Sequence, residues 1–284
     1  MKILVTGING QVGHALMREL TEHELIGLTR KECDLTNLDQ IRQVIDQHQP
    51  DLIINPAAYT NVDQAEDEPD LAFQINRDAP KVMAEKAREY DIPFIHFSTD
   101  YVFNGEKEGP YDENDTPLPL GIYGLSKLSG EEAIQGIGGK FFIFRTSWVY
   151  SILENNFYYK IRLKCKEKKE LSVVCDQIGV PTSNLFISYQ LKKILKKLNI
   201  DKAGLYHIVP NNYCSWFDFA KIIITKTNSH FDLDNLIKIN SSELNVKVNR
   251  PQNSVLCNDK IKLAFNLKFS SWQEEFDKVI KCSK

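Results

Sequence analysis

KILVTGINGQVGHALMREL, residues Lys2 to Leu20, decides the fold class of this chain. The run Lys2–Thr6 is mostly apolar and ends at a glycine, which is typical of a strand buried in a parallel sheet. Helical periodicity begins at Gln11, and the turn before it carries the pattern GxxGxxG. Glycines at such a turn let a diphosphate approach the backbone N–H groups and the positive end of the helix dipole. The stretch therefore predicts a dinucleotide site, formed by Gly7, Asn9, Gly10, Gln11, Val12 and Gly13.

The alternation of strand and helix continues through the first half of the chain. Further strands are predicted at Leu25–Leu28, Asp51–Asn55, Phe94–Ser98 and Lys140–Arg145. Helices are predicted between them at Leu38–Ile45, Pro69–Tyr90 and Tyr123–Ala133. This order predicts an α/β fold of the Rossmann type, a doubly wound parallel sheet that binds its ligand at the carboxyl ends of the strands.

The pattern is looser beyond Trp148. Helices are predicted at Lys160–Glu170, Phe186–Leu198, Trp216–Thr225 and Trp272–Ile280, and a strand at Leu205–Val209. We expect residues 1–150 to form a dinucleotide-binding domain. Residues 151–284 are expected to form mainly a smaller substrate-binding lobe, with a segment of about 178–210 returning to the Rossmann domain.

Composition excludes several classes of partner. A formal net charge of −3 over 284 residues gives no basic excess for a nucleic acid. No apolar run approaches the length of a membrane span, and the first residues lack the pattern of a secretory signal, so a cytoplasmic protein is expected. Cysteines and histidines form no cluster with metal-ligand spacing, so no metal is expected.

The second predicted strand ends in Leu28-Thr29-Arg30-Lys31, where NAD-binding proteins usually carry an acid for the ribose diol. Arg30 could instead bind a 2′-phosphate through its planar guanidinium group. NADPH is therefore the expected cofactor, while NADH stays open, as does the alternative that Arg30 is an ordinary turn residue. After the third predicted strand, the small residues of the segment that includes Ala57, Ala58 and Tyr59 would let the backbone pass close to the cofactor.

Tyr123 and Lys127 are four residues apart, so on a helix they share one face. An ammonium close to a phenol favours the phenolate and lowers the pKa of the phenol, which could then give a proton to a carbonyl oxygen while hydride reaches the carbon. Thr99, at the end of the fourth predicted strand, would help to polarise that carbonyl. Thr99, Tyr123 and Lys127 are the predicted catalytic residues, and Tyr123 and Lys127 are also expected to contact the cofactor.

The glycine spacing and this set of residues resemble the extended short-chain dehydrogenase/reductase superfamily. HFSTDYVFNG, YDENDTPLPLGIYGLSKLSGE, FRTSWVY and DQIGVPT further resemble the dTDP-4-dehydrorhamnose reductase family, which reduces the C4 ketone of a dTDP-linked 6-deoxy sugar with NAD(P)H. The resemblance implies that Asp34 and Leu35 lie by the adenine. It also implies sugar or nucleotide contacts from Val62, Thr99, Asp100, Tyr101, Trp148 and Arg250. On general grounds Trp148 is equally well explained as a core residue.

Other functions remain open at this point. One is a reductase or epimerase of another nucleotide-linked deoxysugar, and another is a non-catalytic regulatory subunit resembling the β-subunit of methionine adenosyltransferase. Some members of the family hold a metal at a dimer contact through an acid after the third glycine, but this chain has His14-Ala15 there. No metal is therefore inferred, and a homodimer is one of the oligomeric states left open.

Overall fold

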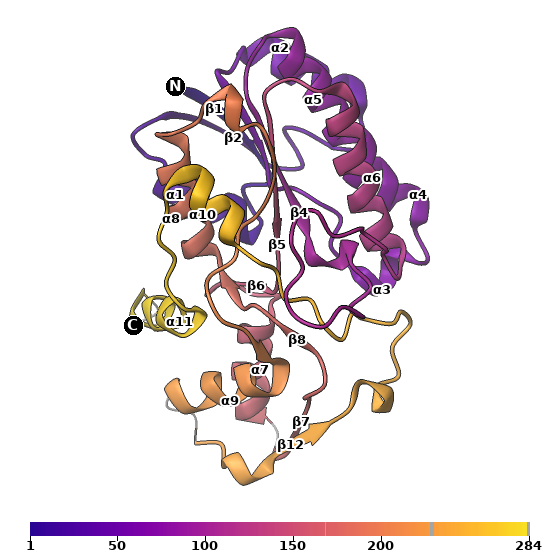
Figure 1. The fold of residues 1–284 in the computed structure, drawn as a ribbon, viewed down its shortest axis with the longest axis vertical. Helices are drawn as coiled ribbons and strands as arrows, with labels where there is room; N and C mark the ends of the chain where they lie inside the picture. The colour runs from indigo at the N-terminus through magenta and orange to yellow at the C-terminus, as the bar shows by residue number, and fades with distance from the viewer. Residues whose placement is uncertain (168, 228–229, 283–284) are drawn as a thin grey trace.

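The computed structural model describes residues 1–167, 169–227 and 230–282. Its centre is a sheet of six parallel strands in the order β10-β5-β4-β3-β1-β2 (Figure 1). The strands are β1 (Lys2–Thr6), β2 (Glu24–Leu28), β3 (Leu52–Asn55), β4 (Phe94–Thr99), β5 (Phe141–Thr146) and β10 (Gly204–His207). The predicted α/β class with a Rossmann-type sheet is confirmed, and β10 brings a late segment of the chain to the sheet edge beside β5.

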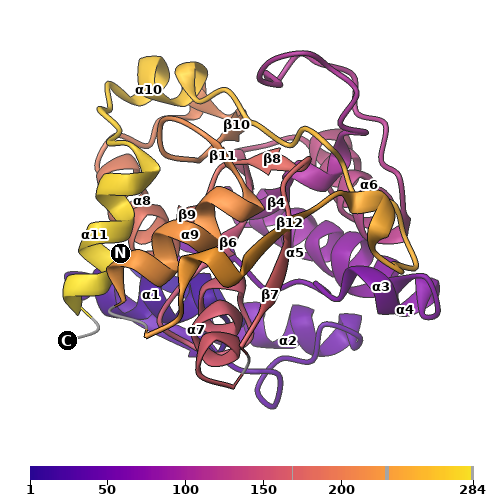
Figure 2. The same ribbon diagram turned by 90° about the horizontal axis from the view of Figure 1, so that it is seen from below.

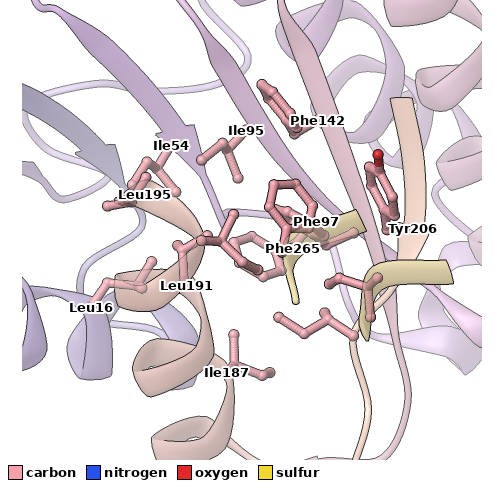
Figure 3. Close-up of a cluster of buried hydrophobic side chains, with 14 of the residues drawn as sticks. Leu16, Ile54, Ile95, Phe97, Phe142, Ile187, Leu191, Leu195, Tyr206 and Phe265 are labelled. Atoms are coloured by element: carbon pink, nitrogen blue, oxygen red, sulfur yellow. The ribbon is translucent and has the colours of Figure 1, made fainter. Parts of the chain in front are cut away.

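Helices cover both faces of this sheet, as Figure 1 shows. One face carries α1 (Gln11–Glu19), α8 (Asn184–Leu195) and α10 (Asp259–Phe265), and the other carries α2 (Leu38–His48), α5 (Ala79–Glu89) and α6 (Ile122–Ile137). Successive side chains of a strand point to opposite faces, so Ile95 joins the first core while Phe94 joins the second. Figure 3 shows the first core, where residues of α8 such as Leu191 meet strand residues such as Ile54.

The helix predicted over Pro69–Tyr90 is helical throughout but changes pitch. It consists of α4 (Pro69–Phe73), a π-helical turn η1 (Gln74–Asp78) and α5. Pro80 explains the wider turn because it lacks the N–H that an α-helix would donate to the carbonyl of Asn76. That carbonyl is approached by α6 instead, at Gly130, where an added Cβ would lie 2.1 Å from the Asn76 oxygen.

The C-terminal region is smaller and mixed. Its helices are α7 (Phe157–Glu167), α9 (Trp216–Lys226) and α11 (Trp272–Cys282). Its short strands pair as β7 (Leu171–Val174) with β12 (Leu236–Ile239), β6 (Val149–Tyr150) with β9 (Thr182–Ser183), and β8 (Ile178–Gly179) with β11 (Cys214–Ser215). Figure 2 shows these elements from below the sheet. The helix predicted at Lys160–Glu170 begins earlier, at Phe157, and position 168 lies outside the described residues.

The remaining elements are single turns that the sequence periodicity did not indicate. They are α3 (Val62–Ala65), η2 (Asp100–Val102), η3 (Ile200–Lys202), η4 (Leu233–Asn235) and η5 (Ser241–Glu243). In the described part of the chain, no helix is both long and apolar enough to cross a membrane.

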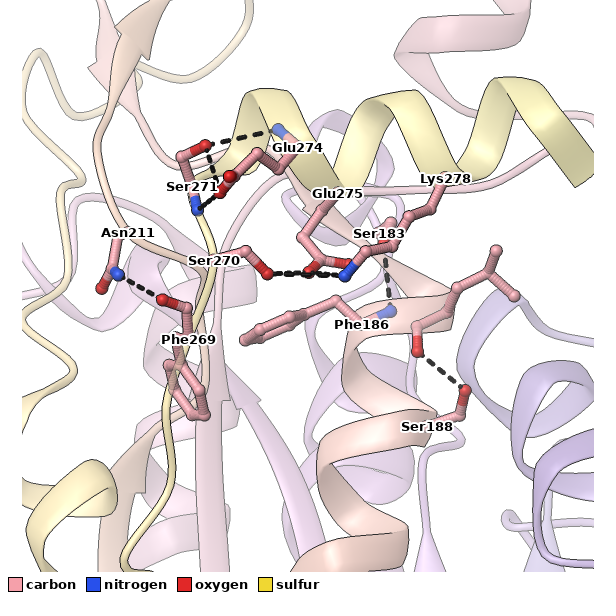
Figure 4. A network of polar contacts seen from close by, with 11 residues as sticks. Ser183, Phe186, Ser188, Asn211, Phe269, Ser270, Ser271, Glu274, Glu275 and Lys278 are labelled. Atoms are coloured by element: carbon pink, nitrogen blue, oxygen red, sulfur yellow. Dashed lines mark hydrogen bonds and ion pairs between the residues drawn. The ribbon is translucent and has the colours of Figure 1, made fainter.

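Polar contacts hold the start of α11 and the segment before it, as Figure 4 shows. Ser271 and Glu274 cap the first turn of α11, with the Ser271 amide donating to Glu274 over 2.8 Å. The nearly buried Glu275 accepts from Lys278 over 2.7 Å and from the Ser270 hydroxyl. The segment before α11 also packs Phe269 edge-on against Phe186 of α8, with ring centroids 4.9 Å apart.

Candidate active site

A cleft of about 490 Å³ opens at the carboxyl ends of the sheet strands. The chain order reverses between β1 and β3, which is the switch point where this class of sheet binds its ligand. The cleft walls include Gly7 after β1 and Ala57 after β3. The predicted residues that line it are Gly7, Asn9, Gly10, Gln11, Val12, Ala57, Ala58, Tyr123 and Lys127.

At two positions of the glycine loop there is no space for a side chain larger than the hydrogen atom of glycine. Gly7 has a φ of +60°, and a Cβ added there would lie 2.7 Å from the Cβ of Ala57. A Cβ on Gly13 would lie 2.4 Å from the Gly7 carbonyl oxygen. Gly10 caps α1 without a side-chain hydrogen bond, and the first turn of α1 has no acidic residue. The N–H groups at this helix end therefore fit a diphosphate, which no carboxylate of the first turn of α1 would repel.

A second hollow continues from the cleft past Asn9, and Arg30 and Lys31 line it. The Arg30 side chain is 77% exposed, with its Nε 3.8 Å from Asp34 Oδ2. The Asp34 side chain accepts hydrogen bonds from the backbone and hydroxyl of Thr36. Leu35 is buried in the core between the sheet and α2, and neither Asp34 nor Leu35 lines the two hollows.

Tyr59 does not line the cleft. Its hydroxyl donates to Glu68 over 2.8 Å, and its backbone N–H donates to Asn76 over 2.9 Å. Burial, together with the Glu68 carboxylate, raises the pKa of Tyr59 to about 12. Its neighbour Thr60 lines the cleft instead.

Thr99 and Tyr123 meet beside the cleft. Thr99 is the last residue of β4, and its hydroxyl donates to Asp100 over 3.0 Å. Tyr123 lies in the first turn of α6. Burial raises the pKa of Tyr123 to about 12 and outweighs a hydrogen bond with Thr99 that acts in the opposite direction. The expected lowering of this pKa by Lys127 is therefore wrong for this structure, because burial dominates.

Lys127 is almost fully buried one turn further along α6. Its Nζ donates to the carbonyl oxygen of Phe97 over 2.6 Å and lies 3.0 Å from His96 Nε2. Burial lowers the pKa of Lys127 to about 8, against the charge of Glu131, which raises it. Helix α6 can pack closely against the turn that contains Tyr101 because Gly124 faces the Tyr101 carbonyl. A Cβ added to Gly124 would be 2.2 Å from that carbonyl oxygen.

Three of the predicted sugar or nucleotide contacts, Asp100, Tyr101 and Arg250, lie close to Tyr123 or to one another. The Tyr101 ring meets the Tyr123 ring edge-on, with centroids 5.5 Å apart. Burial raises the pKa of Asp100 to about 7, although hydrogen bonds with Ser254 and Thr99 act in the opposite direction. Arg250 Nη2 lies 3.3 Å from Asp63 Oδ2, and the Arg250 charge lowers the pKa of Tyr101 against the larger effect of burial. Val62 precedes Asp63 at the start of α3.

Trp148 is half-buried and does not line the cleft. Its ring stacks on Trp216 of α9, with centroids 3.4 Å apart and planes 7° apart. Its φ is +47°, and Gly179 lies under the ring, where an added Cβ would be 2.4 Å from the indole. Trp148 therefore connects the end of the sheet to the C-terminal region through packing.

Nine further residues line the cleft that were not named as site residues from the sequence, namely Pro56, Thr60, Phe97, Ser98, Thr146, Val149, Leu153, Glu154 and Asn155. The hydroxyls of Ser98 and Thr146 are buried without a partner among the described residues. The positions of Ser98 and Thr146 in the cleft could have been predicted, because these residues lie at the ends of β4 and β5 and the carboxyl ends of parallel strands face the ligand. The loop containing Leu153 follows no such rule, and nothing in its sequence indicates the cleft.

Within residues 1–167, 169–227 and 230–282, no group of three or more His, Cys, Asp and Glu side chains is placed to hold a metal ion.

Comparisons with known proteins agree along the whole chain. The family model described as RmlD substrate binding domain matches residues 1–284. The dTDP-4-dehydrorhamnose reductase of Aggregatibacter actinomycetemcomitans is 37% identical over 98% of both chains, and that of Escherichia coli K12 is 38% identical over 96% of this chain and 95% of its own. The crystal structure of the Bacillus anthracis dTDP-4-dehydrorhamnose reductase in complex with NADP superposes with a TM-score of 0.91 at 35% identity, covering 98% of both chains. The Clostridium acetobutylicum structure gives 0.94 at 33% identity, covering 99% of both.

Proposed function

The chain belongs to the dTDP-4-dehydrorhamnose reductase family, and from that premise we propose that its cleft reduces the C4 ketone of dTDP-4-dehydro-L-rhamnose to give dTDP-L-rhamnose. The activity is that of dTDP-4-dehydrorhamnose reductase, an NADP-binding oxidoreductase. The observation that supports the placement of the reaction is that Tyr123 and Lys127 line the cleft beside the glycine loop, with Thr99 hydrogen-bonded to Tyr123.

When bound, the nicotinamide cofactor would supply a hydride for the ketone carbon. The N–H groups around Gly10 would bind its diphosphate, and Arg30 would bind the 2′-phosphate that distinguishes NADPH from NADH. The pair Asp34 and Leu35 would lie near the adenine, and Tyr59 would contribute through its backbone, since its hydroxyl is engaged by Glu68.

Tyr123 would be the proton donor. Because burial raises its pKa to about 12, the phenol keeps its proton at neutral pH and can give it to the ketone oxygen as charge develops there. The Thr99 hydroxyl, which donates to Asp100 in the structure, would turn to donate its hydrogen bond to the same ketone oxygen.

Lys127 would hold the cofactor ribose and stabilise the phenolate left on Tyr123. The amine is charged below its pKa of about 8 and neutral above it, so this support is present at neutral pH and is lost as the pH rises through 8. Turnover is therefore expected to fall on the alkaline side.

The substrate would lie against Val62, Asp100, Tyr101 and Arg250, with Arg250 pairing with the nucleotide diphosphate. Trp148 would shape the sugar site from its stack on Trp216. In this proposal residues 1–150 bind the cofactor, residues 151–284 mainly bind the substrate, and the segment of about 178–210 belongs with the sheet.

A direct assay tests the proposal. The purified protein, mixed with dTDP-4-dehydro-L-rhamnose and NADPH, is expected to consume the reduced cofactor in step with formation of dTDP-L-rhamnose. Absence of cofactor oxidation, under conditions in which the E. coli relative is active, would contradict it. Such a result would instead support the epimerase or the regulatory-subunit alternative, which the full-length relatives do not favour.

Arg30→Ala is expected to raise the KM for NADPH about ten- to a hundredfold and to change the KM for NADH little. The reason is that the exposed guanidinium group has only a long contact to Asp34, so it is available for a 2′-phosphate. Steady-state kinetics with both cofactors measure the effect. Arg42→Ala removes an equally charged, exposed arginine that pairs with Asp39 and lies outside the two hollows, and serves as the control. An equal rise in KM for NADPH and for NADH would contradict the role of Arg30 in binding the 2′-phosphate.

A further inference from the structure

A chain of buried hydrogen bonds runs from the glycine loop to Lys127. Thr6, the last residue of β1, donates from its hydroxyl to Asn55 Oδ1 over 2.6 Å. Asn55 Nδ2 lies 3.2 Å from His96 Nδ1, and His96 Nε2 lies 3.0 Å from Lys127 Nζ. Each of these four side chains is at most 2% exposed. The chain therefore joins three neighbouring strands and α6 behind the wall of the cleft.

The protonation states along this chain are linked. With the Asn55 amide donating to Nδ1, a neutral imidazole carries its proton on Nε2 and donates to Lys127, which must then be a neutral amine. With the amide turned over, Thr6 accepts from Nδ2 and Nδ1–H donates to Oδ1. The Nε2 lone pair then accepts from a charged ammonium. The charged ammonium thus requires the tautomer with its proton on Nδ1, and the tautomer with its proton on Nε2 requires the neutral amine.

Both arrangements need a neutral imidazole. Burial, together with the nearby lysine charge, lowers the pKa of His96 well below its usual value. A charged imidazole would carry a proton on both nitrogens and repel the ammonium 3.0 Å away. His96 can therefore exchange tautomers without gaining a charge of its own.

The charged groups around Lys127 among the described residues have partners of their own. Glu131, on the same helix, forms a bidentate pair with Arg145 of β5. The elements packed against α6 contribute further charged or titratable groups that are engaged elsewhere, namely Glu66 with the Ile122 amide, Arg77 with Asp78, and Asp100 with Thr99. His96 is thus the side chain of the sheet that contacts the lysine amine directly.

We propose that His96 is a positioning residue for Lys127, whose imidazole holds the amine in place and changes tautomer with the charge of that amine. The proposal rests on the role of Lys127 in the proposed function. It adds that the sheet interior, and not the cleft alone, sets the pH at which Lys127 loses its proton. The bond between the imidazole lone pair and the ammonium is charge-assisted, so the imidazole favours the charged lysine.

His96→Leu tests this inference. The variant removes both nitrogens, so the pKa of Lys127 is expected to fall by about one pH unit, and the alkaline limb of the kcat profile should move with it. The amine pKa is measured by NMR titration of ¹⁵N-labelled lysine side chains in the full chain. Lys127→Met identifies the signal. A Lys127 pKa that stays at the wild-type value in His96→Leu would overturn the proposal.

Asn55→Asp gives a shift of opposite sign. A carboxylate can only accept, so it fixes the proton of His96 on Nδ1 and leaves the Nε2 lone pair toward the ammonium. The pKa of Lys127 is expected to rise by about one pH unit. This variant decides the matter if His96→Leu does not fold, and an unchanged or lowered pKa in it would overturn the proposal.

His207→Leu is the matched control. His207 is an equally buried histidine of the same sheet, on β10, and its Nδ1 lies 3.1 Å from the Cys257 carbonyl oxygen. It is expected to leave the pKa of Lys127 unchanged, and an equal shift in it would overturn the proposal. If the amine pKa moves in His96→Leu while the kcat profile does not, the inference about His96 stands and the proposed role of Lys127 in turnover fails.

Discussion

Tyr123→Phe is expected to lower kcat about 10²- to 10⁴-fold while cofactor binding stays close to that of the wild-type protein. The change removes one oxygen atom, and with it the proton that the proposed mechanism gives to the ketone oxygen. Since burial raises the pKa of Tyr123 to about 12, the wild-type phenol is protonated throughout the neutral range. The ring itself is retained, so its edge-on contact with Tyr101 remains.

The measurement is single-turnover reduction followed by cofactor absorbance, together with a separate titration of cofactor binding. Tyr59→Phe is the matched control, because Tyr59 also has a pKa raised to about 12 but its hydroxyl bonds to Glu68 outside the cleft. The control is expected to turn over at a rate near that of the wild type. Turnover near the wild-type rate in Tyr123→Phe would remove Tyr123 as the acid.

Arg145→Met is expected to lower the free energy of unfolding by about 3–5 kcal/mol. Arg145 binds Glu131 through two nitrogens, at 2.9 and 2.6 Å, and the two side chains are 4% and 0% exposed. Removing the arginine leaves a buried carboxylate without its charge partner, and the low polarity around it makes that costly. Urea denaturation measures the change.

Two controls isolate the buried pair. The double variant Glu131→Leu/Arg145→Met removes both charges and is expected to recover most of the stability, because apolar pairs often replace buried ion pairs without loss. Arg42→Met breaks a surface pair with Asp39 and is expected to cost less than about 1 kcal/mol.

The first half of the fold could be predicted because its signals are local. The run Lys2–Thr6, the glycines after it and the helix from Gln11 lie within twenty residues, and each depends on backbone geometry that neighbouring residues decide. The short strands of the C-terminal region, such as β7 and β12, could not be predicted. They pair across more than sixty residues of sequence, so no local pattern indicates which two segments come together.

The cleft was predictable where it follows a strand end and not where it depends on a loop. Gly7 and Tyr123 belong to patterns with a defined place relative to the sheet, and both line the cleft. Tyr59 also lies in a segment that follows a strand end. Its hydroxyl donates to Glu68, however, and its side chain does not line the cleft. Leu153 lines it from a loop whose path is set by packing between distant segments.

The sequence by itself determined that this protein has a Rossmann-type sheet, a dinucleotide loop, and a tyrosine and lysine one helical turn apart. Only the tertiary structure decided how those two side chains behave. Burial raises the pKa of Tyr123 and lowers that of Lys127, and Lys127 contacts His96, thirty-one residues earlier in the chain. The physical reason is that a pKa depends on desolvation and on the partners within a few ångströms, and both are fixed only when strands and helices far apart in the sequence pack together.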